Sequence, residues 1–122
     1  MGGESPIFSK TFDLLLWISS HTEKFPKNER FRLARRIEDS AFHMHSMLLR
    51  AAYQKRLGKG IEGTAPSAAL SYLQEADIAL KQLQFYFRIT HHKQLSTTRQ
   101  YVFISEMLLE IGKLIGAWIK TV

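Results

Sequence analysis

Positively charged side chains are concentrated in one segment of this chain. Between Lys24 and Lys59 the sequence has ten lysine or arginine residues and three acidic ones, while the whole chain of 122 residues carries a net charge of +6. A clustered set of basic side chains attracts polyanions, whereas the same charge spread evenly mainly aids solubility. The segment is therefore the expected place of a nucleic-acid interface.

Helical spacing places several of these side chains on one face. Four positions are separated by four and seven residues: Arg32, Arg36, His43 and Arg50. Such intervals return an α-helix to nearly the same angle, and arginine there can hold phosphate oxygens bidentately. Binding of this kind releases counterions and depends on salt concentration. The candidate nucleic-acid-binding residues are Lys27, Arg30, Arg32, Arg35, Arg36, Arg50, Lys55 and Arg56.

A second interpretation of the basic segment stays open. In it, the positive charges form a solvated face and pair with the acidic side chains of the same segment: Glu29, Glu38 and Asp39. A basic face is a permissive signal, and the sequence has no RNA-recognition, zinc-finger or helix-turn-helix signature that would decide between the two interpretations.

Catalytic and metal-binding patterns are not found. His43 and His45 are two residues apart and point about 200° from each other on a helix, so they cannot easily share a metal ion. His91 and His92 are adjacent, with the same difficulty. The stretch GKGIEGT lacks the GxxxxGK(S/T) order of a phosphate-binding loop. We therefore expect no catalytic residues, no metal ligands, no cofactor and no enzymatic activity.

The composition is typical of a globular protein in a reducing compartment. Hydrophobic residues make up 45% of the chain and charged residues 23%, and cysteine is absent, which excludes disulfides. The stretch MGGESPIFSKTF lacks the basic and apolar regions of a signal peptide, and no window approaches the ~20 apolar residues of a membrane span. A cytoplasmic protein without a membrane partner is expected.

Apolar periodicity predicts an all-α fold with four helices in one domain, 1–122. The expected helices are 6–24, 27–57, 66–92 and 97–120, separated by Pro26, a glycine-rich loop from Gly58 to Ser67, and a capping Ser96. The second and third helices carry the most regular seams: Ala34, Ile37, Ala41, Met44, Leu48 and Ala51, then Leu73, Ala76, Leu80, Leu83 and Phe87. Four long amphipathic helices with short connections favour an antiparallel up-down four-helix bundle.

The first and fourth helices have less regular patterns. The expected core positions are Phe8, Phe12, Leu15 and Ile18 in the first helix, and Tyr101, Ser105, Leu108, Gly112, Ile115 and Ile119 in the fourth. The glycines Gly112 and Gly116 are four residues apart, a spacing that indicates close approach to a neighbouring helix.

Three of the expected helices carry more apolar residues than one core would use. The additional stripes are Phe31, Phe42, Leu49 and Tyr53, then Tyr72, Ala79 and Tyr86, then Ile104, Ile111 and Trp118. Monomers rarely expose large contiguous apolar patches, so these stripes indicate contact with another copy, unless the core is simply wide and aromatic-rich. The candidate interface residues are Phe31, Phe42, Tyr53, Tyr72, Tyr86 and Trp118.

Three stretches resemble the accessory variability determinant (Avd) proteins of diversity-generating retroelements: SPIFSKTFDLLLWI, KFPKNERFRLARRIEDSA and LSTTRQYVFISEMLLEIGKLIGAWIK. The more specific elements are FPKxxRF (Phe25, Pro26, Lys27, Arg30, Phe31) and EIGxLxGxW (Glu110, Ile111, Gly112, Leu114, Gly116, Trp118). The resemblance covers the chain except the Gly58 to Ser67 loop. It extends to a wider group of four-helix proteins that includes those encoded by intervening sequences in rRNA genes.

The resemblance implies a ring-like homopentamer of four-helix bundles that binds nucleic acid and pairs with a reverse transcriptase. Two functions are therefore expected. The first is a basic, non-enzymatic accessory subunit that binds RNA or DNA and a reverse transcriptase. The second is a structural homo-oligomer of the same fold with an unknown partner, whose charge serves solubility or that partner.

Overall fold

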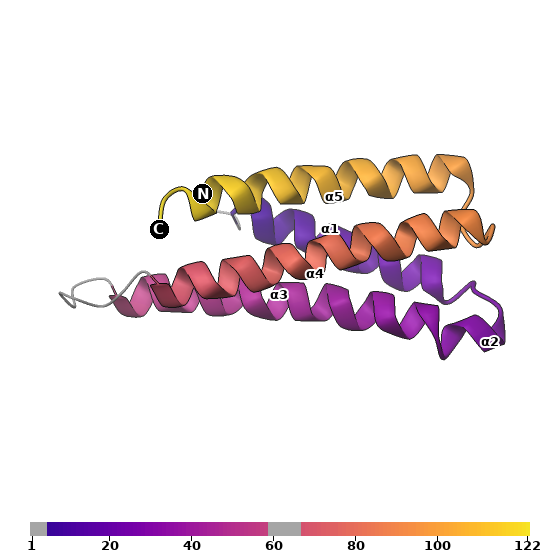
Figure 1. Ribbon diagram of the computed structural model, residues 1–122, viewed down its shortest axis with the longest axis horizontal. Coiled ribbons are helices and arrows are strands. Elements are labelled where there is room, and N and C mark those ends of the chain that lie inside the picture. The colour runs from indigo at the N-terminus through magenta and orange to yellow at the C-terminus, as the bar shows by residue number, and fades with distance from the viewer. Residues whose placement is uncertain (1–4, 59–66) are drawn as a thin grey trace.

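Four long helices and one short helix make up the computed structural model, which describes residues 5–58 and 67–122 (Figure 1). In chain order they are α1 (Pro6–Thr22), α2 (Lys27–Arg30), α3 (Leu33–Gly58), α4 (Ser67–His92) and α5 (Thr98–Ile119). The two described ranges contain no strand, and the fold is all-α, as the sequence predicts. Most of the expected glycine-rich loop, and the expected helix start at residue 66, lie outside the described residues.

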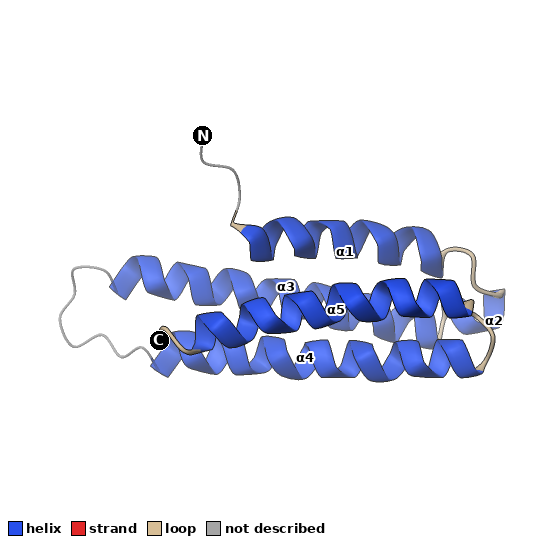
Figure 2. Ribbon diagram, turned by 90° about the horizontal axis from the view of Figure 1, so that it is seen from above, coloured by secondary structure: helices blue, strands red, loops and turns tan. Residues whose placement is uncertain are grey.

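The four long helices alternate in direction and form an antiparallel bundle (Figures 1 and 2). α1 and α4 lie diagonally opposite each other, and each packs against both α3 and α5. Sequential helices joined by short connections become antiparallel neighbours, which is the up-down arrangement that the sequence predicts. The bundle therefore has four sides: α1/α3, α3/α4, α4/α5 and α5/α1.

The predicted core seams of α3 and α4 are confirmed. All six predicted positions of α3, from Ala34 to Ala51, are at most 3% exposed, and all five of α4, from Leu73 to Phe87, are at most 2% exposed. Intervals of three and four residues keep one side of a helix against its neighbours over many turns. The opposite side of α3, which carries the basic residues, is thereby turned to solvent.

The core face of α5 is rotated from the predicted one. Its buried residues are Ile104, Leu108, Ile111 and Ile115, whereas Tyr101, Ser105, Gly112 and Ile119 are half-buried. The assignment of Ile104 and Ile111 to a second apolar stripe is therefore wrong, as is that of Ala79 in α4, which is buried in the core. α5 is apolar over much of its circumference, so periodicity fits two neighbouring faces equally well.

α1 shows the same rotation. Its buried side chains include Ile7, Thr11, Leu14 and Ile18. Of the predicted core positions, Phe8 and Leu15 are half-buried and Phe12 is 58% exposed. Thr11 is tolerated in the core because its hydroxyl donates a 2.6 Å hydrogen bond to the Ile7 carbonyl within the helix.

The segment expected to form one second helix is interrupted at Phe31 and Arg32, between α2 and α3. Two anchors hold the single turn of α2 across the end of the bundle (Figure 1). The Phe25 side chain is buried, and the buried Glu29 carboxylate pairs with the Lys93 ammonium just after α4. The chain therefore changes direction before the core seam of α3 begins.

The sequence predicts Ser96 as the cap of α5, but the cap is Thr97. The Thr97 hydroxyl accepts a 3.1 Å hydrogen bond from the Gln100 amide, and the Gln100 side chain accepts one of 2.9 Å from the Thr97 amide, which completes a capping box. Ser96 is buried, with Oγ 2.7 Å from His21 Nε2 and 2.8 Å from Thr90 Oγ1. These contacts tie the α4–α5 turn to α1.

The two glycines of α5 differ in their surroundings. A methyl group on Gly112 would lie 3.0 Å from Leu80 Cδ2 of α4, whereas one on Gly116 would meet nothing within 4 Å among the described residues. The predicted close helix approach is therefore confirmed at Gly112 and absent at Gly116.

Replacing each glycine by alanine separates these two situations. Gly116→Ala is expected to raise the free energy of unfolding by up to about 1 kcal/mol, because alanine lowers the entropy of the unfolded chain and favours helix. In Gly112→Ala the same gain is offset by displacement of Leu80, so its melting temperature should stay below that of Gly116→Ala. Thermal unfolding of both variants checks this, and a destabilised Gly116→Ala would contradict it.

Candidate nucleic-acid interface

Helix α3 holds a line of basic side chains that we name the basic stripe: Arg32, Arg36, His43 and Arg50. All four side chains are exposed. Arg32 precedes α3, yet its carbonyl accepts a 3.3 Å hydrogen bond from the Arg36 amide, which keeps it in line with the helix. A packed helix therefore presents these groups on a rigid support.

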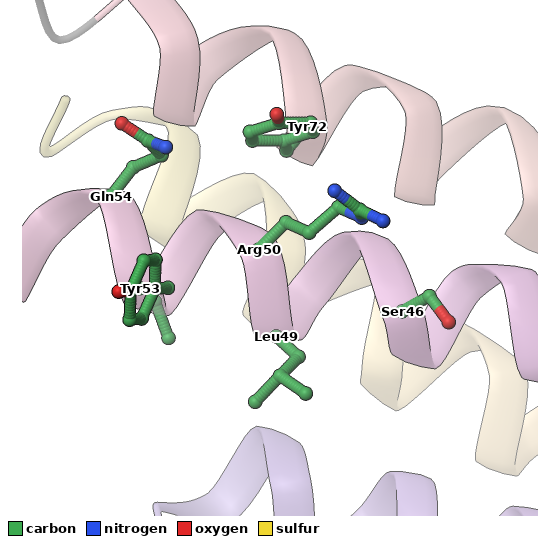
Figure 3. A pocket seen from close by; sticks show the side chains of 7 residues that line it. Ser46, Leu49, Arg50, Tyr53, Gln54 and Tyr72 are labelled. Atoms are coloured by element: carbon green, nitrogen blue, oxygen red, sulfur yellow. The ribbon is translucent and has the colours of Figure 1, made fainter.

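The basic stripe lies on the α3/α4 side of the bundle. His43 Nε2 is 3.5 Å from the Glu75 carboxylate of α4, and Ser40 Oγ donates a 3.2 Å hydrogen bond to Gln82 Oε1 of the same helix. In Figure 3 the Arg50 side chain extends toward α4, whereas Leu49 projects from the opposite side of α3 toward α1. The side chains of Arg50 and Leu49 thus point in different directions from α3.

Three arginines meet at the start of α3. Arg32, Arg35 and Arg36 line a surface pocket together with Phe31 and Asp39. The arginine side chains are exposed, and a single carboxylate lies among three guanidinium groups. Such an excess of positive charge in one hollow suits an anion such as a backbone phosphate.

The contacts of the acidic side chains in the basic segment test the alternative interpretation, in which these acids neutralise the basic face. Glu29 pairs with Lys93, and Glu38 accepts a 2.6 Å hydrogen bond from Thr22 Oγ1 of α1. Within 5–58 and 67–122, no ion pair or side-chain hydrogen bond engages the guanidinium groups of Arg32, Arg35, Arg36 or Arg50. Two of the three available carboxylates are therefore used elsewhere, which leaves the arginines able to receive phosphate.

Comparison with known families adds a second kind of evidence. The family model described as bAvd-like matches residues 7–122, a range that includes every described helix apart from the first residue of α1. The chain belongs to the bAvd-like family. It is thereby an accessory protein of the retroelement kind, and the suspected resemblance to Avd is confirmed. No curated protein matches the chain.

The remaining predicted basic residues of the bAvd-like chain have different surroundings. Lys27 is exposed at the start of α2. Arg30 Nε donates a 3.1 Å hydrogen bond to the Phe25 carbonyl, so part of its role is to stabilise the corner between α1 and α2. Lys55 and Arg56 lie outside the residues whose side chains are described.

The predicted interface residues divide into two groups. Phe31, Phe42 and Tyr53 are 57–69% exposed. Tyr72, Tyr86 and Trp118 are half-buried against their own core, and Trp118 makes an edge contact with Phe8, with ring centroids 6.4 Å apart. The first group is therefore mostly exposed, whereas the second presents only part of each side chain to solvent.

The exposed apolar side chains of the bAvd-like bundle include three that the sequence analysis placed on a second stripe (Phe42, Leu49, Tyr53), four that it missed (Leu16, Phe85, Val102, Leu109), and Phe12, which it assigned to the core. They form two groups, an α1/α3 face (Phe12, Leu16, Phe42, Leu49, Tyr53) and an α4/α5 face (Phe85, Val102, Leu109), all at least 49% exposed. In α5, helical spacing puts Val102 and Leu109 on the surface next to Gly112, which contacts α4. In α3, Glu38 and His45 contact α1, and helical spacing puts Phe42 and Leu49 beside them. The two faces lie on opposite sides of the bundle.

The described part of the chain offers no constellation for metal or cofactor chemistry. No group of three potential metal ligands occurs there. His21 is buried, stacks on Trp17 with ring centroids 4.5 Å apart, and bonds to Ser96. Burial, and secondarily the nearby Lys24 charge, lower the pKa of His21, so its neutral form joins α1 to the α4–α5 turn. None of the described helices has an apolar stretch long enough to cross a membrane.

Proposed function

We propose that this bAvd-like protein binds RNA or DNA on the basic stripe of α3 and holds it for a reverse transcriptase, without catalysis of its own. The observation that carries the proposal is the set of exposed arginines on one rigid helix, with no acidic partner among the described residues. Contacts of arginine with phosphate carry no base information, so affinity for different sequences should be similar.

The proposal includes assembly into a ring, for which five copies are expected from the family resemblance. A ring requires heterologous contacts, in which one surface of each subunit meets a different surface of the next. The α1/α3 and α4/α5 faces are two apolar surfaces on opposite sides of one bundle, which is what such contacts need. The α3/α4 side would stay free, and its basic stripe would be repeated once per subunit.

A charge-matched pair of triple variants tests the nucleic-acid interface. Arg32→Gln/Arg36→Gln/Arg50→Gln should weaken binding to a duplex about 10- to 100-fold near physiological salt, because three phosphate contacts are lost. The slope of log K against log salt should fall by about 3 for each bound subunit. Fluorescence anisotropy over a salt series gives both quantities.

The control removes the same charge from exposed positions elsewhere: Arg88→Gln/Arg99→Gln/Lys113→Gln. If the two triple variants bind equally well, net charge and not the basic stripe governs affinity. If the parent protein binds neither nucleic acid nor a reverse transcriptase in co-purification, the second candidate function stands. That function is a structural homo-oligomer, and the two apolar faces favour it independently of the arginines.

A further inference from the structure

Two tyrosines of α4 lie near the level of two arginines of the basic stripe. The hydrogen bond between Ser40 and Gln82 places these two residues near the same level of the antiparallel pair α3 and α4. Four residues before Ser40 is Arg36, and four residues after Gln82 is Tyr86. Ten residues after Ser40 is Arg50, and ten before Gln82 is Tyr72. Antiparallel helices rise equally per residue, so each arginine lies within about one helical turn of the level of one tyrosine across the seam.

The second of these pairs forms part of a pocket. Arg50 and Tyr72 both line it, together with side chains of α3: Ser46, Leu49, Ala52, Tyr53 and Gln54. Figure 3 shows Arg50 reaching from α3 toward the helix that carries Tyr72. A guanidinium group and an aromatic ring are therefore offered side by side in a hollow of the surface.

Both tyrosines are held in place but not covered. Each is half-buried, with part of its side chain packed on the hydrophobic core. Within the described residues neither ring stacks on another aromatic ring, whereas Tyr101 stacks on His91 with centroids 4.5 Å apart. A ring already fixed by packing loses little conformational entropy when it stacks on a ligand.

We infer that the α3/α4 seam binds single-stranded nucleic acid, with unpaired bases stacked on Tyr72 and Tyr86 and neighbouring phosphates held by Arg50 and Arg36. The inference rests on the proposed function and specifies its ligand. The two pairs are fourteen residues apart on each helix, or about 21 Å along the bundle, so a strand a few nucleotides long reaches both. A basic track with aromatic platforms is the general solution for binding unpaired strands.

A duplex satisfies only half of this arrangement. Its phosphates can reach the arginines, but its bases are stacked on one another inside the double helix and cannot stack on the tyrosines. The tyrosines should therefore separate two ligand classes that the arginines do not distinguish.

The test compares Tyr72→Leu/Tyr86→Leu with the parent protein on three labelled ligands of equal length: an unstructured single-stranded RNA, an abasic oligonucleotide and a duplex. Leucine keeps apolar packing and removes the ring. Affinity for the RNA should fall about 5- to 100-fold per lost stacking contact, while affinity for the abasic strand and the duplex changes less than about twofold. Tyr72→Phe/Tyr86→Phe keeps both rings and should bind as the parent does.

Two outcomes would overturn the inference and leave the proposed function intact. One is equal affinity of the parent protein for the RNA and the abasic strand, a measurement that needs no variant to fold. The other is an equal loss on RNA and duplex in the leucine variant. Failure of the parent to bind any of the three ligands would instead contradict the proposed function itself.

Discussion

Replacing Phe87 by alanine is expected to lower the free energy of unfolding by about 3–5 kcal/mol, the range for truncating a buried aromatic side chain. Phe87 is 0% exposed in α4, and its ring contacts Trp17 edge-on with centroids 5.9 Å apart. It also lies 6.4 Å from the ring of His21, which joins α1 to the α4–α5 turn. The substitution therefore opens a cavity between α4 and α1, in a protein whose total stability is of order 5–15 kcal/mol.

The same helix supplies a matched control. Phe85 is two residues away and 57% exposed, so Phe85→Ala should change stability by less than about 1 kcal/mol in the monomer. Denaturant unfolding followed by circular dichroism measures both variants. Equal effects of the two substitutions would mean that α4 turns a different face to the core.

The seams of α3 and α4 were predictable because their apolar positions recur at unbroken intervals of three and four residues. Periodicity then has one solution, and all eleven predicted positions are buried. α5 offers two solutions, since Ile104 and Tyr101 both begin plausible apolar faces. Which of them is buried depends on the approach of α4 at Gly112, a contact between distant parts of the chain.

The interruption before α3 was unpredictable for a similar reason. It depends on the pair formed by Glu29 and Lys93, which are 64 residues apart in sequence. Nothing local in the sequence indicates that Glu29 points into the bundle end.

The candidate site was partly predictable. Positions opposite a regular seam must face solvent, and the four residues of the basic stripe are exposed. Whether their charges are neutralised depends on which groups the nearby acidic side chains contact. The Glu38 carboxylate accepts a hydrogen bond from Thr22 of α1, a contact that the sequence does not indicate. The pairing of Arg50 with Tyr72 likewise requires the register of two helices, which the sequence of either helix alone does not contain.

Charged substitutions on the two apolar faces should each prevent assembly. Phe42→Glu/Leu49→Glu places two carboxylates in the α1/α3 face, and Phe85→Glu places one in the α4/α5 face. Burying an unpaired charge in an apolar contact costs several kcal/mol, so each variant alone should have the monomer mass of 14.1 kDa in light scattering. Gln54→Glu/Gln82→Glu adds charge on the α3/α4 side and should leave the parent's mass unchanged.

Mixing the two monomeric variants distinguishes a ring from a symmetric dimer. In a heterologous contact the α1/α3 face of one subunit meets the α4/α5 face of the next, so each variant retains the face that the other has lost. The mixture should form a one-to-one heterodimer that cannot grow further, because its two outer faces carry the charges. In an isologous contact each face meets its own copy, so one variant would keep the parent's mass and mixing would add nothing. The heterodimer should also bind a long RNA more weakly than the parent ring, because fewer basic stripes act together.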